Sequence, residues 1–329
     1  DDDPVNFNDG AYFTIGIARN RTIRDGTWGA DSVWLTGKVP GPNETALISE
    51  HDTIDVYMDV DIGQVIIEDS ALVLIDEDNA DDGVGDGQAF NIEFTLNNGT
   101  IEVQGDGGIN TGTGEVRYSA TTDQDIAAIT YYDLSVRGAG NKTLLGNLDV
   151  NHNIELLASG NLTLDADAVN NYSINVANNW NSNGNIFEPR SGQVIFDGGG
   201  SHVIEGNFTG NMQVFNDITV NNANLKLRRG NISVGGTLNT NNTNVDADYD
   251  NFIDTLIIGV SSTQRGTLNS GSGYVIGALG KWYTTGAQSY KYLNGTSSNL
   301  RPVNIDFSNV TTGGYVIVDF DENDPGENG

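Results

Sequence analysis

Four aspartates in the C-terminal third of the chain are spaced like the ligands of a calcium loop. In the stretch DADYDNFID, Asp246, Asp248, Asp250 and Asp254 occupy positions 1, 3, 5 and 9 of an EF-hand-like loop. Oxygen ligands at alternate positions can surround one hard cation, which takes about six to eight of them. Position 12 is Ile257, so the last carboxylate has to come from elsewhere. The pattern predicts a calcium site, with a solvated acidic turn as the alternative.

A second acidic loop, DEDNADDGVGDG, is another candidate for cation binding. Packing many carboxylates together is costly unless water or a cation screens them. The glycines of this loop also suit a flexible segment, so both interpretations stay open. The aspartates assigned to calcium in this loop are Asp76, Asp78, Asp81 and Asp82.

Catalytic chemistry has little support in the sequence. His51, His152 and His202 are far apart and lack metal-type spacing. The chain has no cysteine, which excludes disulfides, thiolate metal sites and a cysteine nucleophile. No serine-nucleophile motif is visible either. We therefore predict no catalytic residues and no enzyme activity. A β-helix polysaccharide-degrading enzyme remains an alternative, because distant Asp and Glu side chains can meet on the face of a solenoid.

The charge of the chain limits its partners. Its 329 residues include 45 Asp plus Glu against 15 Lys plus Arg, a formal net charge of −30. A chain this acidic is a poor nucleic-acid binder, because phosphate contacts need cationic side chains. No apolar run is long enough to cross a bilayer, so no membrane insertion is expected. The opening DDDPVNF, acidic and without Met, suits a processed mature N-terminus.

The elements that must position these residues are short strands. Apolar residues alternate with polar ones in DTIDVYMDV, GQVIIED, ALVLIDED and GTIEVQG. Glycine, Asn and Asp separate such runs at intervals of about 8–12 residues. Helical periodicity is almost missing. This pattern predicts an all-β fold made of many short strands.

One unit of the chain is written twice. GTGEVRYSATTDQDI, from Gly112, matches RSGQVIFDGGGSHVI, from Arg190. YYDLSV and FNDITV follow, and the offset between the copies grows from 78 to 84 residues, an insertion of six. Repeats with in-line insertions are typical of a solenoid, in which each coil contacts only its neighbours. We predict a right-handed parallel β-helix (β-solenoid), with Tyr118 and Phe196 as stacked core positions.

The expected organisation has three parts. Residues 1–23 form an N-terminal strand segment, residues 24–264 form the solenoid with its repeat at about 101–136 and 174–220, and residues 265–329 form a small antiparallel β module with an acidic tail. The apolar N-terminal segment AYFTIGIA either caps its own solenoid or pairs with an open edge of a neighbouring subunit. The residues assigned to self-assembly are Tyr12, Phe13, Ile15 and Ile17.

Three segments resemble units of the repeat-bearing secreted surface proteins of Bacteroidota, which carry adhesin-type β-helix segments. GTWGADSVWLTGKVPGPNETALISEHDTIDV resembles their opening unit, and SYKYLNGTSSNLRPVNIDF resembles their closing unit. The segment that is written twice resembles their recurring middle unit. The resemblance implies export, an extracellular location at the cell surface, and adhesion or matrix roles.

These features together predict a non-catalytic secreted structural protein of the cell surface. The expected partner is a second copy of the chain, in a homopolymer that forms an extracellular filament or sheath, with Ca²⁺ as the expected cofactor. The alternative is a monomeric adhesin that binds glycans or another surface.

Overall fold

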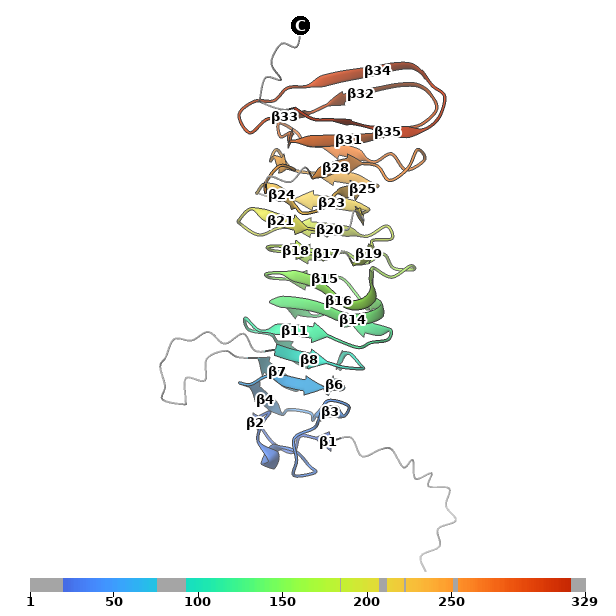
Figure 1. Ribbon diagram of the computed structural model, residues 1–329. Coiled ribbons are helices and arrows are strands. Elements are labelled where there is room, and N and C mark those ends of the chain that lie inside the picture. The colour runs from blue at the N-terminus through green and yellow to red at the C-terminus, as the bar shows by residue number, and fades with distance from the viewer. Residues whose placement is uncertain are drawn as a thin grey trace, which may run out of the picture.

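The protein is a rod of stacked turns. A computed structural model describes residues 20–75, 93–183, 185–206, 212–221, 223–250 and 254–320. The turns follow one another from the N-terminal end to the C-terminal end (Figure 1). Strands of successive turns pair in parallel along nearly the whole rod. The predicted parallel β-solenoid is confirmed, and its right-handed sense stays a prediction.

Each turn adds one short strand to each of three walls, which we name the long wall, the second wall and the third wall. The long wall is a thirteen-stranded sheet that begins at β5 and ends at β33. Its strands are β5 (Val60–Ile62), β8 (Glu93–Leu96), β11 (Glu115–Tyr118), β14 (Asp133–Leu144), β16 (Ile154–Asp165), β18 (Trp180–Asn181), β21 (His202–Glu205), β24 (Leu225–Arg228), β27 (Val245–Asp246), β30 (Val275–Ile276) and β33 (Asn294–Gly295), with β12 (Gln124–Ile126) and β19 (Ile186–Glu188) as side branches.

The other two walls are interrupted. The second wall contains β1 (Asn20–Arg21), β3 (Thr45–Ile48), β6 (Gln64–Ile67) and β9 (Ile101–Val103), and later β22 (Gln213–Phe215), β25 (Ile232–Val234), β28 (Thr255–Ile258), β31 (Ala278–Tyr283) and β35 (Gly314–Val318). The third wall contains β2 (Gly26–Thr27), β4 (Thr53–Val56), β7 (Leu72–Ile75) and β10 (Gly108–Asn110), and later β13 (Thr130–Tyr131), β15 (Leu148–Val150), β17 (Ile174–Val176), β20 (Gln193–Phe196), β23 (Asp217–Val220), β26 (Thr237–Asn239) and β29 (Thr267–Asn269).

Alternation of side chains explains why these segments form strands. In β11, Val116 and Tyr118 are buried while Glu115 and Arg117 face outward, and most strands repeat this pattern. The inward residues join into one apolar core that extends from Trp28 to Tyr292. Each turn therefore buries its apolar face only against the turns above and below it.

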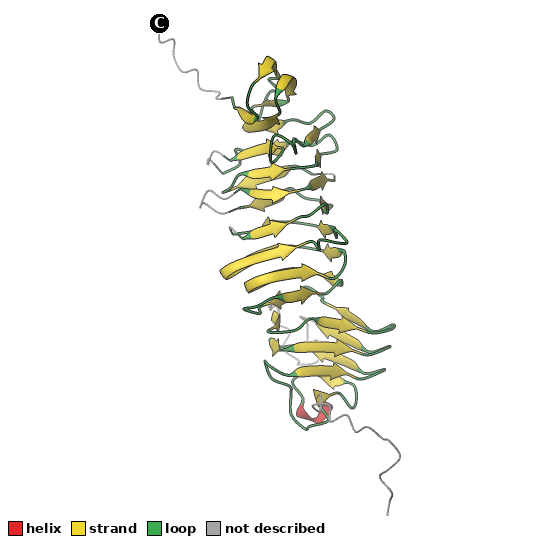
Figure 2. Cartoon of the chain, turned by 90° about the vertical axis from the view of Figure 1, so that its right-hand side faces the viewer, coloured by secondary structure: helices red, strands yellow, loops and turns green. Residues whose placement is uncertain are grey.

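The N-terminal end is closed by tryptophans beside the short 3-10 helix η1 (Asp31–Val33), the one helix among the described residues (Figure 2). The rings of Trp28 and Trp34 lie 5.1 Å apart, and Trp28 contacts Phe94 at 5.4 Å. The indole N–H of Trp34 donates to the carbonyl of Trp28 at 2.9 Å. These buried rings fill the first turns, where no earlier described turn covers the core.

The two long strands β14 and β16 bend and pass from one wall to the next. The first half of β14 pairs in the long wall, and its second half pairs with β12. The pairing of β14 with β16 shifts register between Gly138 and Gly140. Both glycines have positive φ, 81° and 83°. A Cβ on Gly138 would lie 2.1 Å from the carbonyl oxygen of Ala120. Glycine is required at this corner because only it allows both the conformation and the close approach.

The repeated unit corresponds to a pair of strands in adjacent turns. In the first copy Glu115 of β11 aligns with Asp133 of β14, and in the second Gln193 of β20 aligns with Asp217 of β23. The six inserted residues fall between β21 and β22, outside this pairing. The first pair belongs to the long wall and the second to the third wall. Tyr118 and Phe196 are therefore both core residues, but they do not stack on one another.

Asn and Asp side chains connect successive turns. The side-chain oxygen of Asn153 accepts from the backbone N–H of Asn179 at 3.2 Å, and Asn179 accepts from Val203 at 2.9 Å one turn later. Each such bond satisfies a backbone donor at a turn and contributes about 1 kcal/mol. The same bond joins Asp25 to Thr53, Asp59 to Glu93, Asp69 to Asp106, Asp123 to Asn141, Asp133 to Asn153, Asn147 to Ser173, Asn171 to Ser191, Asn224 to Asn244 and Asn242 to Ser272.

Main-chain pairing of two walls is interrupted together at one level of the rod, which we name the junction, and the second wall is interrupted again between β19 and β22. Among the described strands, β9 pairs only with β6, and β12 pairs only with β14. In the third wall β10 and β13 belong to separate sheets, so only the long wall crosses this level through β8, β11 and β14. The junction lies between β9–β10 and β12–β13.

A buried glutamine bridges the junction in place of a ladder, and a buried lysine on the C-terminal side of the junction supports that glutamine. The amide of Gln124 donates to the carbonyls of Leu96 and Gly99, at 3.1 and 2.7 Å. The ammonium of Lys142, which is fully buried, donates to the carbonyls of Ala120 and Thr122 at 2.7 and 2.8 Å. Burial lowers the pKa of Lys142 to about 8.

The C-terminal end is an antiparallel module, as predicted. β31 pairs antiparallel with β35, and β32 (Gly286–Tyr292) pairs antiparallel with β34 (Val303–Val310). Parallel pairing nevertheless continues past residue 264, to β30 with β33. The inward residues of β34 pack on the core and its outward residues are polar, which is the pattern expected of a terminal cap.

Replacing Lys142 by Met tests the junction. We expect the free energy of unfolding to fall by about 1–3 kcal/mol, because the carbonyls that Lys142 serves are left without their donor. The difference in free energy of unfolding between the two chains should widen between about pH 8 and 10.5. In this window Lys142 holds its proton in the unfolded parent chain but not in the folded one, so the stability of the parent chain rises with pH and that of the variant does not.

Lys291→Met is the matched control, because Lys291 is exposed on β32. Its effect should stay within about 0.5 kcal/mol in the same urea titrations. Equal stability of the Lys142→Met variant and the parent chain would show that the junction does not depend on the buried ammonium.

Candidate functional site

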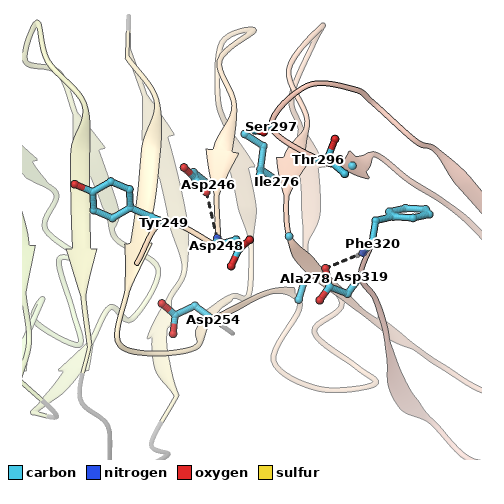
Figure 3. A pocket seen from close by; sticks show the side chains of 13 residues that line it. Asp246, Asp248, Tyr249, Asp254, Ile276, Ala278, Thr296, Ser297, Asp319 and Phe320 are labelled. Carbon is cyan, nitrogen blue, oxygen red and sulfur yellow. Dashed lines mark hydrogen bonds between the residues drawn. The ribbon is translucent and has the colours of Figure 1, made fainter. Parts of the chain in front are cut away.

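Three of the four aspartates of the predicted calcium loop, Asp246, Asp248 and Asp254, line a cleft beside the C-terminal module, whereas Asp250 is not among the residues that line it (Figure 3). The cleft has a volume of about 530 Å³. Asp246 ends β27, Asp248 follows it, and Asp254 precedes β28, while Asp319 reaches the same cleft from the end of β35. We name this feature the acidic cleft. The fold thus brings Asp319, which is distant from Asp254 in the sequence, to the same cleft.

Asp254 is the most buried carboxylate of the acidic cleft. Its side chain is only 5% exposed, and one of its oxygens accepts from the backbone N–H of Gly230 at 2.8 Å. The other oxygen is buried without a hydrogen-bond partner. Burial raises the pKa of Asp254 to about 6, and the carboxylates of Asp250 and Asp248 add to the rise. A buried carboxylate of this kind gains from either a proton or a cation.

Other residues of the loop make contacts within the loop and with the neighbouring strand. The backbone N–H of Asp248 donates to the carboxylate of Asp246 at 3.2 Å, an Asx turn. Lys226 aligns with Asp246 in the neighbouring strand, and its ammonium lies 4.3 Å from the centre of the Tyr249 ring. Asp246 therefore lies next to a cation as well as to other carboxylates.

The structure does not assemble a coordination shell from these residues. In the parts of the chain that the structure describes, no three His, Asp or Glu side chains are grouped closely enough to hold a metal ion. Calcium binding at the acidic cleft stays a prediction. Asp76, Asp78, Asp81 and Asp82 lie outside the described residues, as do Tyr12, Phe13, Ile15 and Ile17.

The three histidines occupy separate places, as their spacing predicts. His202 is buried, with Nδ1 3.0 Å from the carbonyl of Asn178, and burial lowers its pKa. Its counterpart in the repeat, Gln124, is also buried, so this position has a structural role. His152 contacts Asp133 at 2.9 Å, and His51 lies 3.5 Å from Glu50.

A charged patch covers the outward face of the long wall at β8, β11, β14 and β16. Glu115 contacts Arg117 at 2.6 Å and Arg137 at 3.2 Å, and Arg117 also pairs with Glu93. Burial raises the pKa of Glu155, and the carboxylate of Glu115 adds to the rise. The arginines of this patch are thus held by carboxylates of neighbouring strands. The patch strengthens the contact between turns across the junction.

Sequence reasoning found Asp246, Asp248 and Asp254 but missed Asp319 and the charged patch. Asp319 carries no local signal, because its place at the cleft depends on the antiparallel return of β35 beside β31. The charged patch depends on register. Glu93 aligns with Glu115 only once the turn length is known.

No family model matches the chain, and no match was found among the curated proteins or the solved structures. None of the described helices is long and apolar enough to span a membrane.

The substitution Asp254→Asn distinguishes protonation of Asp254 from cation binding at the acidic cleft. Folding raises the pKa of Asp254, so its contribution to stability is complete below its ordinary pKa and is lost as the pH rises through about 6. At pH 7.5 with a chelator, we expect the free energy of unfolding of the variant to exceed that of the parent chain by about 1–3 kcal/mol. The two should converge near pH 4.

Added calcium should reverse this order, because Asn removes the charge that a cation would bind. We expect calcium to stabilise the parent chain at pH 7.5 and to leave Asp254→Asn nearly unchanged, measured by urea unfolding with calcium or chelator. Asp149→Asn, at an exposed position of β15, is the control. Equal stabilisation of all three chains by calcium would contradict a site at Asp254.

Proposed function

We propose that the chain is a non-catalytic structural protein of the extracellular cell surface that assembles into a filament or sheath. The observation that supports this proposal is that polar side chains along the rod form hydrogen bonds between successive turns. Asn and Asp side chains, which could form a binding or catalytic site, instead bond one turn to the next at many levels of the rod. Such bonds reinforce the contact between turns along much of the rod, as a mechanical element requires.

The two ends of the rod favour head-to-tail assembly. The N-terminal end has two-residue edge strands, and the C-terminal end has the longer edge strand β34. β34 has eight residues and pairs only with β32 among the described strands. Unlike ends form a heterologous contact, which produces an open filament when it does not close into a ring.

The N-terminal segment AYFTIGIA has the pattern that suits the free edge of β34. Val303, Ile305 and Phe307 alternate with polar outward residues along β34. Phe13, Ile15 and Ile17 alternate with Thr14 and Gly16 in the same way.

A strand of this pattern, supplied by a neighbouring subunit, would extend the two-stranded sheet and place its apolar side chains over the cap core. Trp28 and Trp34 already close the N-terminal end of the same subunit, so this end has less need of the segment as a cap. Calcium bound in the acidic cleft, at the base of the C-terminal module, would hold that module in place for the contact.

The alternative is a monomeric adhesin that binds glycans or another surface with the side of the rod. The polar outward residues of the three walls favour it, because flat arrays of amides and hydroxyls can bind sugars. Assembly and adhesion are separable by the oligomeric state of the purified chain.

Ile15→Asp and Thr14→Asp test assembly through the N-terminal segment. A charge at Ile15 would lie on the apolar face of the added strand, and a charge at Thr14 on the polar face. We expect Ile15→Asp to lower the association constant at least about tenfold and Thr14→Asp to change it less than about threefold. Sedimentation velocity over a concentration series measures both.

Deletion of residues 1–19 distinguishes assembly from capping. A folded monomer supports pairing between subunits, and loss of the β-sheet circular dichroism signal supports a cap within the subunit. Association of the Ile15→Asp variant that equals the parent chain would contradict the proposed contact.

A further inference from the structure

The junction leaves a polar groove on the second wall. Here β12, a side branch of the thirteen-stranded sheet, follows β9 of the second wall one turn later, but neither pairs with the other. The space beside them is a groove of about 430 Å³. Asn98 and Gln64 line its N-terminal side, and Asp123, Asp125, Asn141 and Thr143 line its C-terminal side. We name it the junction groove.

Part of the lining is fixed by hydrogen bonds within the protein. Asp123 accepts from the backbone N–H of Asn141 at 2.8 Å, and the amide of Asn141 donates to the hydroxyl of Thr143 at 3.0 Å. Gln124 is held behind the groove by the carbonyls of Leu96 and Gly99. These bonds fix the lining groups in place before any ligand arrives, which reduces the entropy cost of binding.

Other groups of the lining keep their hydrogen-bonding capacity. The side chains of Asp125 and Gln64 make no hydrogen bond or ion pair with another described residue. Asp125 is the exposed middle residue of β12, between two buried ones. Its carboxylate and the amide of Gln64 thus offer acceptors and donors from opposite sides of the groove.

We propose that the junction groove binds a neutral glycan chain. Amides, a hydroxyl and carboxylates suit sugar hydroxyls, which both donate and accept hydrogen bonds. Asp123 and Asp125 and the net charge of −30 disfavour an anionic glycan, since like charges repel across an interface. The residues that line the groove include no Lys or Arg that would offset this repulsion. The proposal does not depend on filament assembly.

Neutral hexasaccharides test the proposal directly. The probes are maltohexaose, cellohexaose, xylohexaose and mannohexaose, with hexagalacturonate as the anionic comparison. Isothermal titration of the full chain should detect binding of at least one neutral probe and none of hexagalacturonate. Absence of binding by all four neutral probes at millimolar concentration would overturn the proposal, as would preference for hexagalacturonate.

Asp125→Ala and Asp149→Ala locate the site. Both aspartates are exposed middle residues of three-residue strands, but only Asp125 lines the groove. We expect Asp125→Ala to weaken binding at least about tenfold, because a hydrogen bond to a charged group is lost. Asp149→Ala should change the affinity less than about twofold. Equal affinity of both variants and the parent chain would place the sugar elsewhere, and circular dichroism confirms that each variant is folded.

Discussion

Parallel main-chain pairing between successive turns is the interaction on which the rest of this structure depends. It holds equivalent positions of neighbouring turns at a fixed spacing of about 4.8 Å. Inward apolar residues must then pack on one another, as Val116 does between Phe94 and Leu134 in the register of the long wall. Outward Asn and Asp side chains lie within reach of the next turn, which is why so many accept from its backbone. The acidic composition follows in part from this use of Asp in place of Asn.

The junction shows what happens where the pairing lapses. The core continues through it, but two of the three walls lose their ladder, and side chains take over the bonding. Gln124 reaches the carbonyls of the preceding turn across the junction, and Lys142 reaches carbonyls of the turn that carries Gln124. Tyr118 and Tyr131, whose hydroxyls lie 2.8 Å apart, add a buried polar contact at the same level. The site proposed for a glycan and the buried polar cluster thus have one cause.

Much of the fold could be predicted from the sequence, and the reason is its periodicity. Alternating strands, turn residues and the repeat at Gly112 and Arg190 are local signals, and they led to the solenoid and its antiparallel end. The assignment of strands to walls could not be predicted, because it depends on the length of each turn. The corner at Gly138 and Gly140, the burial of Lys142 and the arrival of Asp319 at the acidic cleft depend on contacts between turns. No pattern along the chain records such contacts.

Electron microscopy of the full chain over a concentration series tests the central proposal most directly, with calcium and again with a chelator. The account predicts filaments whose subunits are rods joined N-terminal end to C-terminal end, with an axial repeat of about one rod length. Dispersed single rods at every concentration, in both conditions, would contradict assembly and favour a monomeric adhesin.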